Sequence, residues 1–497
     1  MVGYFLAMLC FVANLLVASV GAADTAYRKA LLRELGVPGV NLTHGDDGLL
    51  RAATRFEPGA LAFVVPPKYV LTVQEALGSG AGSLINKHAR SLRKTLPRHF
   101  VLAMWVLYTK HVKRRNDLWG LWLASLPSFD TTPLFWDEAE LPMLEEERVL
   151  KRSRARREML EDEYESMVRV LLEEAGLEDD AGEGVISLRE YMWAVTAVTA
   201  CSLHFAEDFP VLVPMRVRFH PYGAAEIYEW GDEQDPGAAL YVGEDGLAEG
   251  RELTVYTDQF NDELMLHGGH AWDELRATSP LLRLSAGELG RRAAASYDER
   301  VEAKRSELMA MQNWSSVMDF ALAVDELPAE LLSWMRLALA APEHVEAAES
   351  PRHFDAPLSV PSERQAVDTL LLTVERSLGA YEFSIEEDEQ LLEAARRGAV
   401  DKPARELAAV GYRLGCKRVL HATRRLAAAH LAGVAQETRR RPPPRQKQPL
   451  PPPVTMAVGV SPTGSQEEAP PPPTTPTPPP PSGAKRKKKR KKTEKSA

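Results

Sequence analysis

Two regions of the chain carry short apolar runs in which β-branched residues recur between glycines and prolines. These regions span residues 45–75 and 200–260. Examples are ALAFVVP at 60–66 and ELTVY at 252–256. Runs of this kind, bounded by residues that favour turns, predict β-strands. We therefore expect two sets of strands, with a long segment between them.

The segment between the strand regions, at about 90–200, has apolar residues at helical spacing. The pattern is clearest at 99–113 and in the charged, amphipathic run 144–174. From Ser285 to Leu431 nearly the whole chain has the same periodicity. Pro328 lies near the first turn of one expected helix and is followed by Glu330, whose carboxylate favours a helix N-terminus. The first stretch predicts a helical insert, and the second predicts a separate helical domain.

These patterns predict an α+β protein of several domains. A chain of 497 residues with 45% hydrophobic content can bury a large core. We expect a strand-bearing domain at 24–280, with its helical insert, and an all-helical domain at 281–435. Residues 1–23 and 436–497 lie outside both domains. We find no internal repeat.

Cysteine content and charge narrow the classes of protein further. Cysteine occurs only at positions 10, 201 and 416, which excludes a disulfide scaffold and a cysteine-rich metal site, and no metal is expected. The net charge of −10 divides into −21 over residues 1–438 and +11 from Arg439 onward. The folded body is therefore acidic, and the tail is basic.

The first 23 residues contain no charged side chain and have an apolar stretch from Tyr4 to Val20. Small residues follow at 20–23, as at a signal-peptidase site, so this leader predicts entry into the secretory pathway by a signal peptide. An uncleaved membrane anchor is the alternative, because the apolar run approaches the ~20 residues that span a bilayer. The leader could also begin a plastid-import signal. Asn41 starts a glycosylation sequon.

The tail at 436–497 is rich in proline and closes on the basic octet Lys485–Lys492. This composition cannot form a packed core, so we expect disorder. The octet could bind nucleic acid or an anionic membrane surface, or direct the protein to the nucleus. A nuclear destination conflicts with the leader, and the sequence leaves both open.

Four motifs, in this order, resemble those of SET-domain protein methyltransferases of the Rubisco large-subunit type. They are ATRFEPGALAFVVP at 53–66, WGLWLASLP at 119–127, TPLFW at 132–136, and GRELTVY with NDELMLHGG within 250–269. Each motif alone would be an ordinary core or strand segment. Their shared order and spacing carry the resemblance, which covers about residues 45–430.

The resemblance implies a SET-domain β-fold with a helical insert, followed by a helical domain that binds the protein substrate. It implies transfer of a methyl group from S-adenosyl-L-methionine to a protein side chain, most often a lysine. Tyr256 falls on the family's active-site tyrosine. Its hydroxyl would orient the substrate amine at the inner end of a narrow, aromatic-lined channel, where loss of water favours the neutral amine.

The cofactor contacts implied by the resemblance are Gly48-Leu49-Leu50, Arg51, His220-Pro221 and Tyr256. The family's Gly-x-Gly turn appears here as Gly48-Leu49-Leu50. Leu50 would therefore place a side chain where bare backbone approaches the cofactor. An expected Asn-His pair appears as His220-Pro221, or is shifted by a deletion.

A Ser-Arg pair of the family appears as Ala200-Cys201, so the arginine that would meet the cofactor carboxylate is missing. Arg51 and Arg55 are candidates to replace its charge. Because three contacts depart from the family, a catalytically inactive, protein-binding SET fold is the alternative function. Gly268 replaces an aromatic residue of many relatives, but the actin-histidine methyltransferase branch also has a small residue there. A histidine substrate therefore stays open too.

Overall fold

The computed structural model describes residues 25–31, 33–34, 42–45, 49–92, 96–113, 117–176, 186–205, 209–230, 237–293 and 298–440. The leader, Asn41, Gly48 and the basic octet lie outside these ranges, so the predictions made for them stay predictions. Of the helices in the described ranges, none is long and apolar enough to cross a bilayer.

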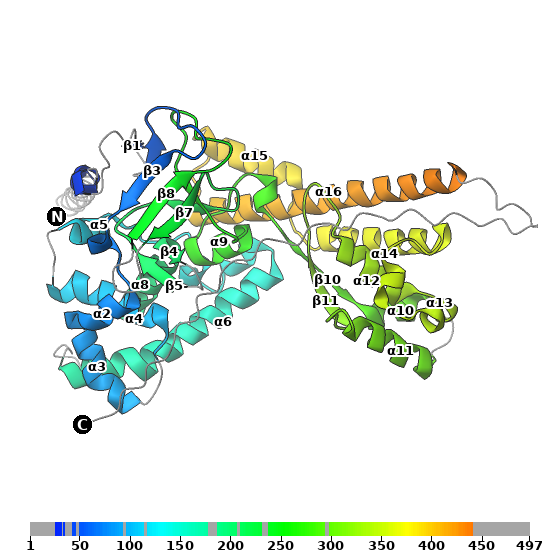
Figure 1. The fold of residues 1–497 in the computed structure, drawn as a ribbon, viewed down its shortest axis with the longest axis horizontal. Coiled ribbons are helices and arrows are strands. Elements are labelled where there is room, and N and C mark those ends of the chain that lie inside the picture. The colour runs from blue at the N-terminus through cyan, green and yellow to red at the C-terminus, as the bar shows by residue number, and fades with distance from the viewer. Residues whose placement is uncertain are drawn as a thin grey trace, which may run out of the picture. The chain divides into compact units, whose positions relative to one another are not determined.

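A mixed sheet of five strands lies in the N-terminal part, in the order β3-β8-β7-β9-β6 (Figure 1). The strands are β3 (Leu61–Val65), β6 (Arg218–His220), β7 (Ala225–Trp230), β8 (Gly237–Val242) and β9 (Thr254–Tyr256). Strand β8 pairs antiparallel with β3 and β7, whereas β9 runs parallel to β6 and β7. Two antiparallel pairs accompany this sheet: β1 (Leu42–His44) with β2 (Leu50–Ala52), and β4 (Ser202–Phe205) with β5 (Phe209–Leu212). These strands fall in or close to the two regions predicted to contain them.

Helices fill the segment between the two strand regions. They are α2 (Val73–Gly78), α3 (Gly80–Leu92), α4 (Arg98–Tyr108), α5 (Leu118–Ser125), α6 (Glu147–Glu163), α7 (Arg169–Ala175) and α8 (Leu188–Cys201). A single π-helical turn, Tyr164–Val168, joins α6 to α7, so the amphipathic run predicted at 144–174 is one nearly continuous helical rod. A further helix, α9 (Asn261–Gly268), follows β9.

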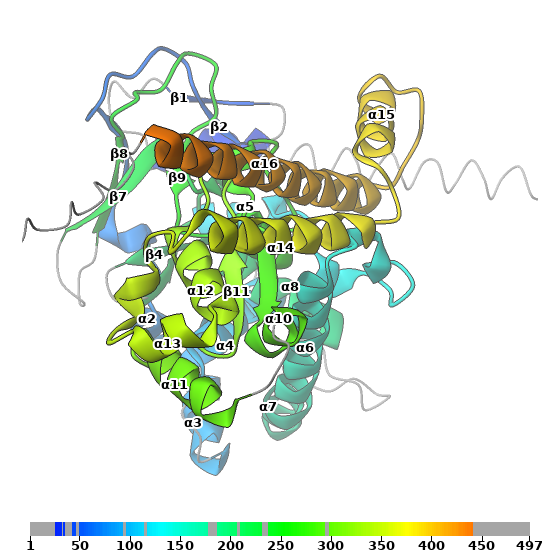
Figure 2. The same cartoon turned by 90° about the vertical axis from the view of Figure 1, so that its right-hand side faces the viewer.

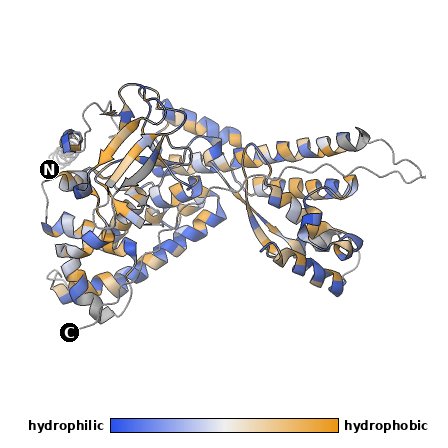
Figure 3. Ribbon diagram, viewed as in Figure 1, coloured by the Kyte–Doolittle hydropathy of each residue, from blue (hydrophilic) through white to orange (hydrophobic). Residues whose placement is uncertain are grey.

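One hydrophobic core unites the sheet with the helical insert. It includes Phe63 of β3, Phe100 of α4 and Tyr191 of α8, each at most 1% exposed. Trp119 packs edge to face against Trp105 and Trp122, at 5.0 and 5.7 Å between ring centroids. The tryptophans at 119 and 122 are therefore core residues. Apolar strands and the mostly hydrophilic α6 stand out in Figure 3.

The C-terminal part is mainly helical, as predicted. Its helices are α10 (Ala286–Ala293), α11 (Glu299–Ala310), α12 (Ala329–Leu339), α13 (Pro342–Ala347), α14 (Val360–Gly379), α15 (Ile385–Arg396) and α16 (Ala404–Arg440). Helices α14 and α16 run side by side (Figures 1 and 2). Its second hydrophobic core includes Trp334, Phe354 and Leu370.

The helical pattern missed one antiparallel pair, β10 (Leu281–Ser285) with β11 (Val317–Ala321). In β10, Leu282 and Leu284 are buried while Arg283 between them is exposed. This two-residue alternation is typical of a strand with one buried face. It covers only five residues on each strand, which is too short to stand out between long helical patterns.

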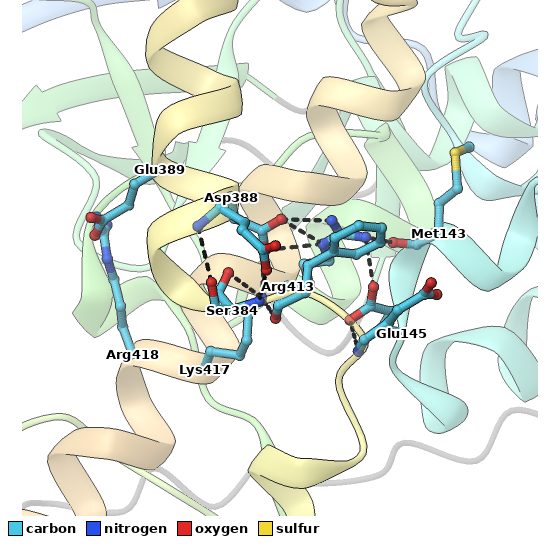
Figure 4. A network of polar contacts seen from close by, with 11 residues as sticks. Met143, Glu145, Ser384, Asp388, Glu389, Arg413, Lys417 and Arg418 are labelled. Carbon is cyan, nitrogen blue, oxygen red and sulfur yellow. Dashed lines mark hydrogen bonds and ion pairs between the residues drawn. The ribbon is translucent and has the colours of Figure 1, made fainter.

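The helical part is joined to the N-terminal part by buried contacts. Trp136, Leu144 and Met265 of the N-terminal part share a hydrophobic cluster with Tyr412 and Cys416 of α16. Polar contacts surround it: the Tyr381 hydroxyl donates to Glu146 at 3.0 Å, and a network around Asp388 is drawn in Figure 4. Burial raises the pKa of Glu146, which favours the neutral carboxyl beside that hydroxyl.

Candidate functional site

An apolar hollow of about 430 Å³ lies beside the sheet. Its walls include Leu49, residues 126–131 after α5, the end of α8 at 200–201, residues 216–218, and residues 268–270 after α9. Most of the lining residues are apolar or glycine, and the charged ones are Asp130, Arg216 and Arg218. Segments far apart in the sequence therefore build one small-molecule-sized cavity.

An acidic hollow of about 830 Å³ opens next to the ends of β6 and β9. It is lined by Arg51, by residues of 220–226 and 243–256, and by Trp272 and Glu274. Five of its side chains are carboxylates and two are guanidinium groups, Arg51 and Arg251. Tyr222 and Tyr256 stand in it with 55% and 54% of their surface exposed. The hollow thus combines aromatic surface with an excess of negative charge.

Contacts of Arg218 connect the linings of the two hollows. Arg218, which lines the apolar hollow, donates from Nε to Glu252 at 2.8 Å and from Nη2 to the other oxygen of the same carboxylate. Its guanidinium lies 4.3 Å from the ring centroid of Trp272. Glu252 and Trp272 line the acidic hollow, so Arg218 links the linings of the two hollows.

The structure brings together four of the predicted site residues and separates the others. Arg51, His220, Pro221 and Tyr256 line the acidic hollow. Leu49 lines the apolar hollow. Leu50 lines neither of these two hollows, and Gly48 lies outside the described residues.

Tyr256 ends β9 and points away from the core. In this strand Val255 is buried and Tyr256 is exposed, as the two-residue period of a strand requires. The hydroxyl has no hydrogen-bond partner among the described residues. The expected position at the inner end of a narrow channel is therefore corrected: in this structure the ring stands half exposed in an open hollow.

His220, at the end of β6, is held by its neighbours. Its Nδ1 accepts a hydrogen bond from the backbone N–H of Tyr222 at 2.9 Å, and its ring lies 4.5 Å from that of Trp272. Burial lowers the pKa of the imidazole, while the carboxylate of Glu274 opposes the shift. A neutral His220 that positions the turn 221–223 is consistent with this geometry.

The turn 221–223 also lies close to the backbone of Tyr256. A side chain on Gly223 would meet the backbone nitrogen of Tyr256 at 2.3 Å. A glycine is required here by the close approach of two backbones. The turn therefore helps to fix the backbone of Tyr256.

Leu50 does not obstruct the site in the way expected from the missing glycine. It pairs with His44 in the β1–β2 ladder, and its side chain is 1% exposed in the main core. Arg51, next along β2, is partly exposed and faces the acidic hollow. Because the side chains of neighbouring residues in a strand point to opposite sides, Leu50 lies in the core and Arg51 faces the acidic hollow.

The sequence motifs did not identify several residues that line the two hollows. Arg216, Arg218 and Trp272 line the two hollows, although no motif pointed to them. His270 also lines the apolar hollow. Arg55, proposed as a replacement charge, instead pairs with Glu57 on the surface, with both side chains more than 70% exposed.

Comparison with known proteins supports the fold. Residues 296–420 match the family model described as Rubisco LSMT substrate-binding. The chain is similar to a crystal structure of the SET domain of LSMT bound to lysine and AdoHcy, with a TM-score of 0.59 and 17% identity, over 83% of this chain and 93% of that chain. A structure of Rubisco LSMT bound to AdoMet gives the same four values. Comparison with curated proteins finds no significant sequence match.

The resemblance drawn from the four motifs is thereby confirmed for the fold, including the order of strands, helical insert and helical region. The chain has the α+β fold of the Rubisco LSMT SET structures, and its residues 296–420 match the model of the Rubisco LSMT substrate-binding family.

Proposed function

We propose that this protein is an S-adenosyl-L-methionine-dependent protein-lysine N-methyltransferase. The observation that carries the proposal is the pair of adjoining hollows, one apolar with guanidinium groups and one acidic with aromatic side chains. Solved structures of the same fold hold AdoMet, AdoHcy and lysine. Two adjoining sites of different chemistry suit a reaction between a cofactor and a protein side chain.

The apolar hollow fits the cofactor. Its volume of about 430 Å³ falls in the usual range for small-molecule sites. Leu49, Leu126 and Val217 offer apolar surface to the adenosine, and Arg216 offers positive charge to the carboxylate. Bound there, the cofactor would supply a methyl group on a sulfonium sulfur.

The acidic hollow fits the substrate lysine. Exposed carboxylates such as Glu244 and Asp245 attract its ammonium group, which has an ordinary pKa of ~10.4. The amine must lose its proton to solvent before its lone pair forms the new N–C bond, as the sulfur–methyl bond breaks and a thioether leaves. Covering the amine against Tyr222, Tyr256 and Trp272 would favour the neutral form. We assign the orientation of that amine to the Tyr256 hydroxyl.

The substrate itself completes the site in this proposal. Because Tyr256 is half exposed, a bound protein segment must supply the missing cover over the hollow. The helical region at 281–435 would hold the rest of the substrate protein, in keeping with the family match at 296–420. A segment with basic residues around the lysine would complement the acidic hollow.

The test is transfer of labelled methyl groups to lysine peptides, read by mass spectrometry. We expect peptides with basic flanks to be methylated faster than otherwise identical peptides with acidic flanks. Reversing two charges, with Glu244→Lys and Asp245→Lys, should raise KM for the basic peptide roughly 10-fold at low salt, from a few exposed charge interactions of ~0.2–1 kcal/mol each. The matched control is Glu161→Lys, an exposed charge on α6 that lies outside both the acidic hollow and the helical region and should change nothing.

Cofactor binding without methyl transfer to any peptide would instead favour the inactive, protein-binding SET fold. Equal rates on basic and acidic flanks would contradict the role given to the acidic hollow while leaving the activity in place.

A further inference from the structure

The acidic hollow continues into a second hollow of about 650 Å³. The two share Glu226, Gly243 and Glu244 in their walls, so they lie side by side. The first contains Tyr256, and the second extends to Pro58 in the turn before β3. We call the two together the acidic groove. Its size suits several side chains of an extended segment of chain, rather than a single side chain.

A fixed turn places two carboxylates beside this groove. Glu244 and Asp245 are exposed in the turn that follows β8, and neither makes an ion pair with a described residue. The N–H of Gly243 donates to the carbonyl oxygen of Ala224 at 2.9 Å, and the N–H of Gly246 donates to that of Gly243 at 3.1 Å. Because these bonds hold the turn against the start of β7, the two carboxylates stay available to a cation that enters the groove.

The C-terminal tail carries the opposite charge. Every residue of the octet Lys485–Lys492 is lysine or arginine, and six of the eight are lysine. A run of positive charge is attracted to a groove lined mainly by carboxylates. The octet therefore complements the groove in charge, and it also offers the side chain on which the proposed reaction acts.

The octet is attached to the folded body by a connection long enough to return to the groove. Helix α16 begins at Ala404, which lines the apolar hollow, and ends at Arg440. At ~1.5 Å per residue, the 37 residues of this helix span about 55 Å. The 44 residues at 441–484 span up to about 150 Å when extended. This is nearly three times the length of the helix, so the octet can reach the acidic groove of its own chain.

We infer that the protein methylates lysines of its own octet Lys485–Lys492, which enters the acidic groove from the tail. This inference rests on the proposed function and names a substrate for it. A lysine amine of the octet loses its proton to solvent, and its lone pair forms the new N–C bond. The sulfur–methyl bond of S-adenosyl-L-methionine breaks at the same time, and the thioether leaves. Because a methylated lysine keeps its positive charge, the octet also competes with other protein substrates after it has been methylated.

The first experiment follows methyl transfer within the full-length protein. The protein is incubated with S-adenosyl-L-methionine that carries a labelled methyl group, and the methylated lysines are mapped by mass spectrometry. We expect label in the octet, with a half-time that dilution of the protein does not change, because the reaction occurs within one chain. Glu244→Lys with Asp245→Lys should slow this transfer roughly 10-fold at low salt, as expected from two charge reversals at an exposed site. Glu161→Lys, an exposed charge on α6 outside the groove, is the control.

Two variants of the octet separate its charge from its chemistry. The first keeps every positive charge but removes the lysines, by Lys485→Arg, Lys487→Arg, Lys488→Arg, Lys489→Arg, Lys491→Arg and Lys492→Arg. The second changes all eight residues of the octet to glutamine. With a separate basic lysine peptide as substrate, the glutamine variant should have a KM about 10-fold lower than the wild type, the effect of removing a tethered competitor that fills about nine-tenths of the sites. The arginine variant should keep the wild-type KM, because it still fills the groove.

The inference is overturned if the separate peptide is methylated while the octet gains no methyl group. It is also overturned if the octet is methylated as fast with Glu244→Lys and Asp245→Lys as in the wild type. A half-time that lengthens in proportion to dilution would show transfer between chains and would overturn it as well. If neither the octet nor any peptide gains a methyl group in a folded protein, the proposed function itself fails, which separates the two failures.

Discussion

Replacing Tyr256 with phenylalanine is expected to lower the rate of methyl transfer about 10²–10³-fold, the usual effect of removing one positioned hydroxyl or N–H from a reaction centre. The folded state should be unaffected, because the hydroxyl has no hydrogen-bond partner among the described residues and the ring is 54% exposed. Rates under saturating cofactor, together with the chemical unfolding midpoint, measure both effects.

Tyr222→Phe is the matched control. Tyr222 lies in the same hollow, is 55% exposed and likewise keeps its hydroxyl without a described partner. The variant should retain most of the activity, since we give the Tyr222 ring only a covering role. If both variants lost the same share of the methyl-transfer rate, Tyr256 would have no role beyond that of Tyr222. A Tyr256→Phe enzyme with the wild-type rate would refute the role given to the Tyr256 hydroxyl.

Replacing Asp388 with alanine is expected to destabilise the folded protein by about 3–5 kcal/mol, the typical cost of removing one partner from a buried ion pair. Asp388 is 1% exposed and accepts from Arg413 Nη2 at 2.6 Å and from Lys417 Nζ at 2.5 Å. Arg413 also donates to Glu145 at 2.8 Å (Figure 4). Without Asp388, Arg413 would keep the carboxylate of Glu145, and the buried ammonium of Lys417 would keep only backbone carbonyl oxygens.

The free energy of unfolding, from chemical denaturation, measures this effect. The neighbouring variant Glu389→Ala is the control, because Glu389 pairs with Arg418 at 2.6 Å near the surface, with 45% and 37% of the side chains exposed. An exposed pair of this kind is worth ~0–1 kcal/mol. If Asp388→Ala cost no more than Glu389→Ala, the buried network would not be what holds α15 and α16 to residues 143–145.

Periodicity within one element was sufficient to predict much of the fold. The apolar run at 60–66 became β3, and the amphipathic run at 144–174 became α6, a π turn and α7. Each of these patterns reports which side of a single element is buried. The long helix Ala404–Arg440 lies in the predicted helical region for the same reason.

The two hollows could not be predicted, because their walls join residues far apart in the chain. Leu49, Cys201 and His270 meet only after the sheet and the insert have packed together. The buried contact between Glu145 and Arg413 joins residues 268 positions apart. Spacing along the sequence contains no direct signal for such pairs.

The sequence does contain a signal for two features that the motifs did not predict: the direction of the arginines at 216 and 218, and the burial of Leu50. In the run 215–219, buried Met215 and Val217 alternate with Arg216 and Arg218, which a strand-like reading would have placed on one face. The same alternation puts Leu50 inward.

Calorimetric titration of the full-length protein with S-adenosyl-L-methionine tests the central claim most directly. The account predicts saturable binding of one cofactor per chain, competed by S-adenosylhomocysteine. Binding should also raise the melting temperature, since a ligand at ~100 times its Kd adds ~2.7 kcal/mol to the folded state. A cooperatively folded protein that shows no binding heat and no shift up to millimolar cofactor would contradict it, and would leave the SET fold as a protein-binding scaffold.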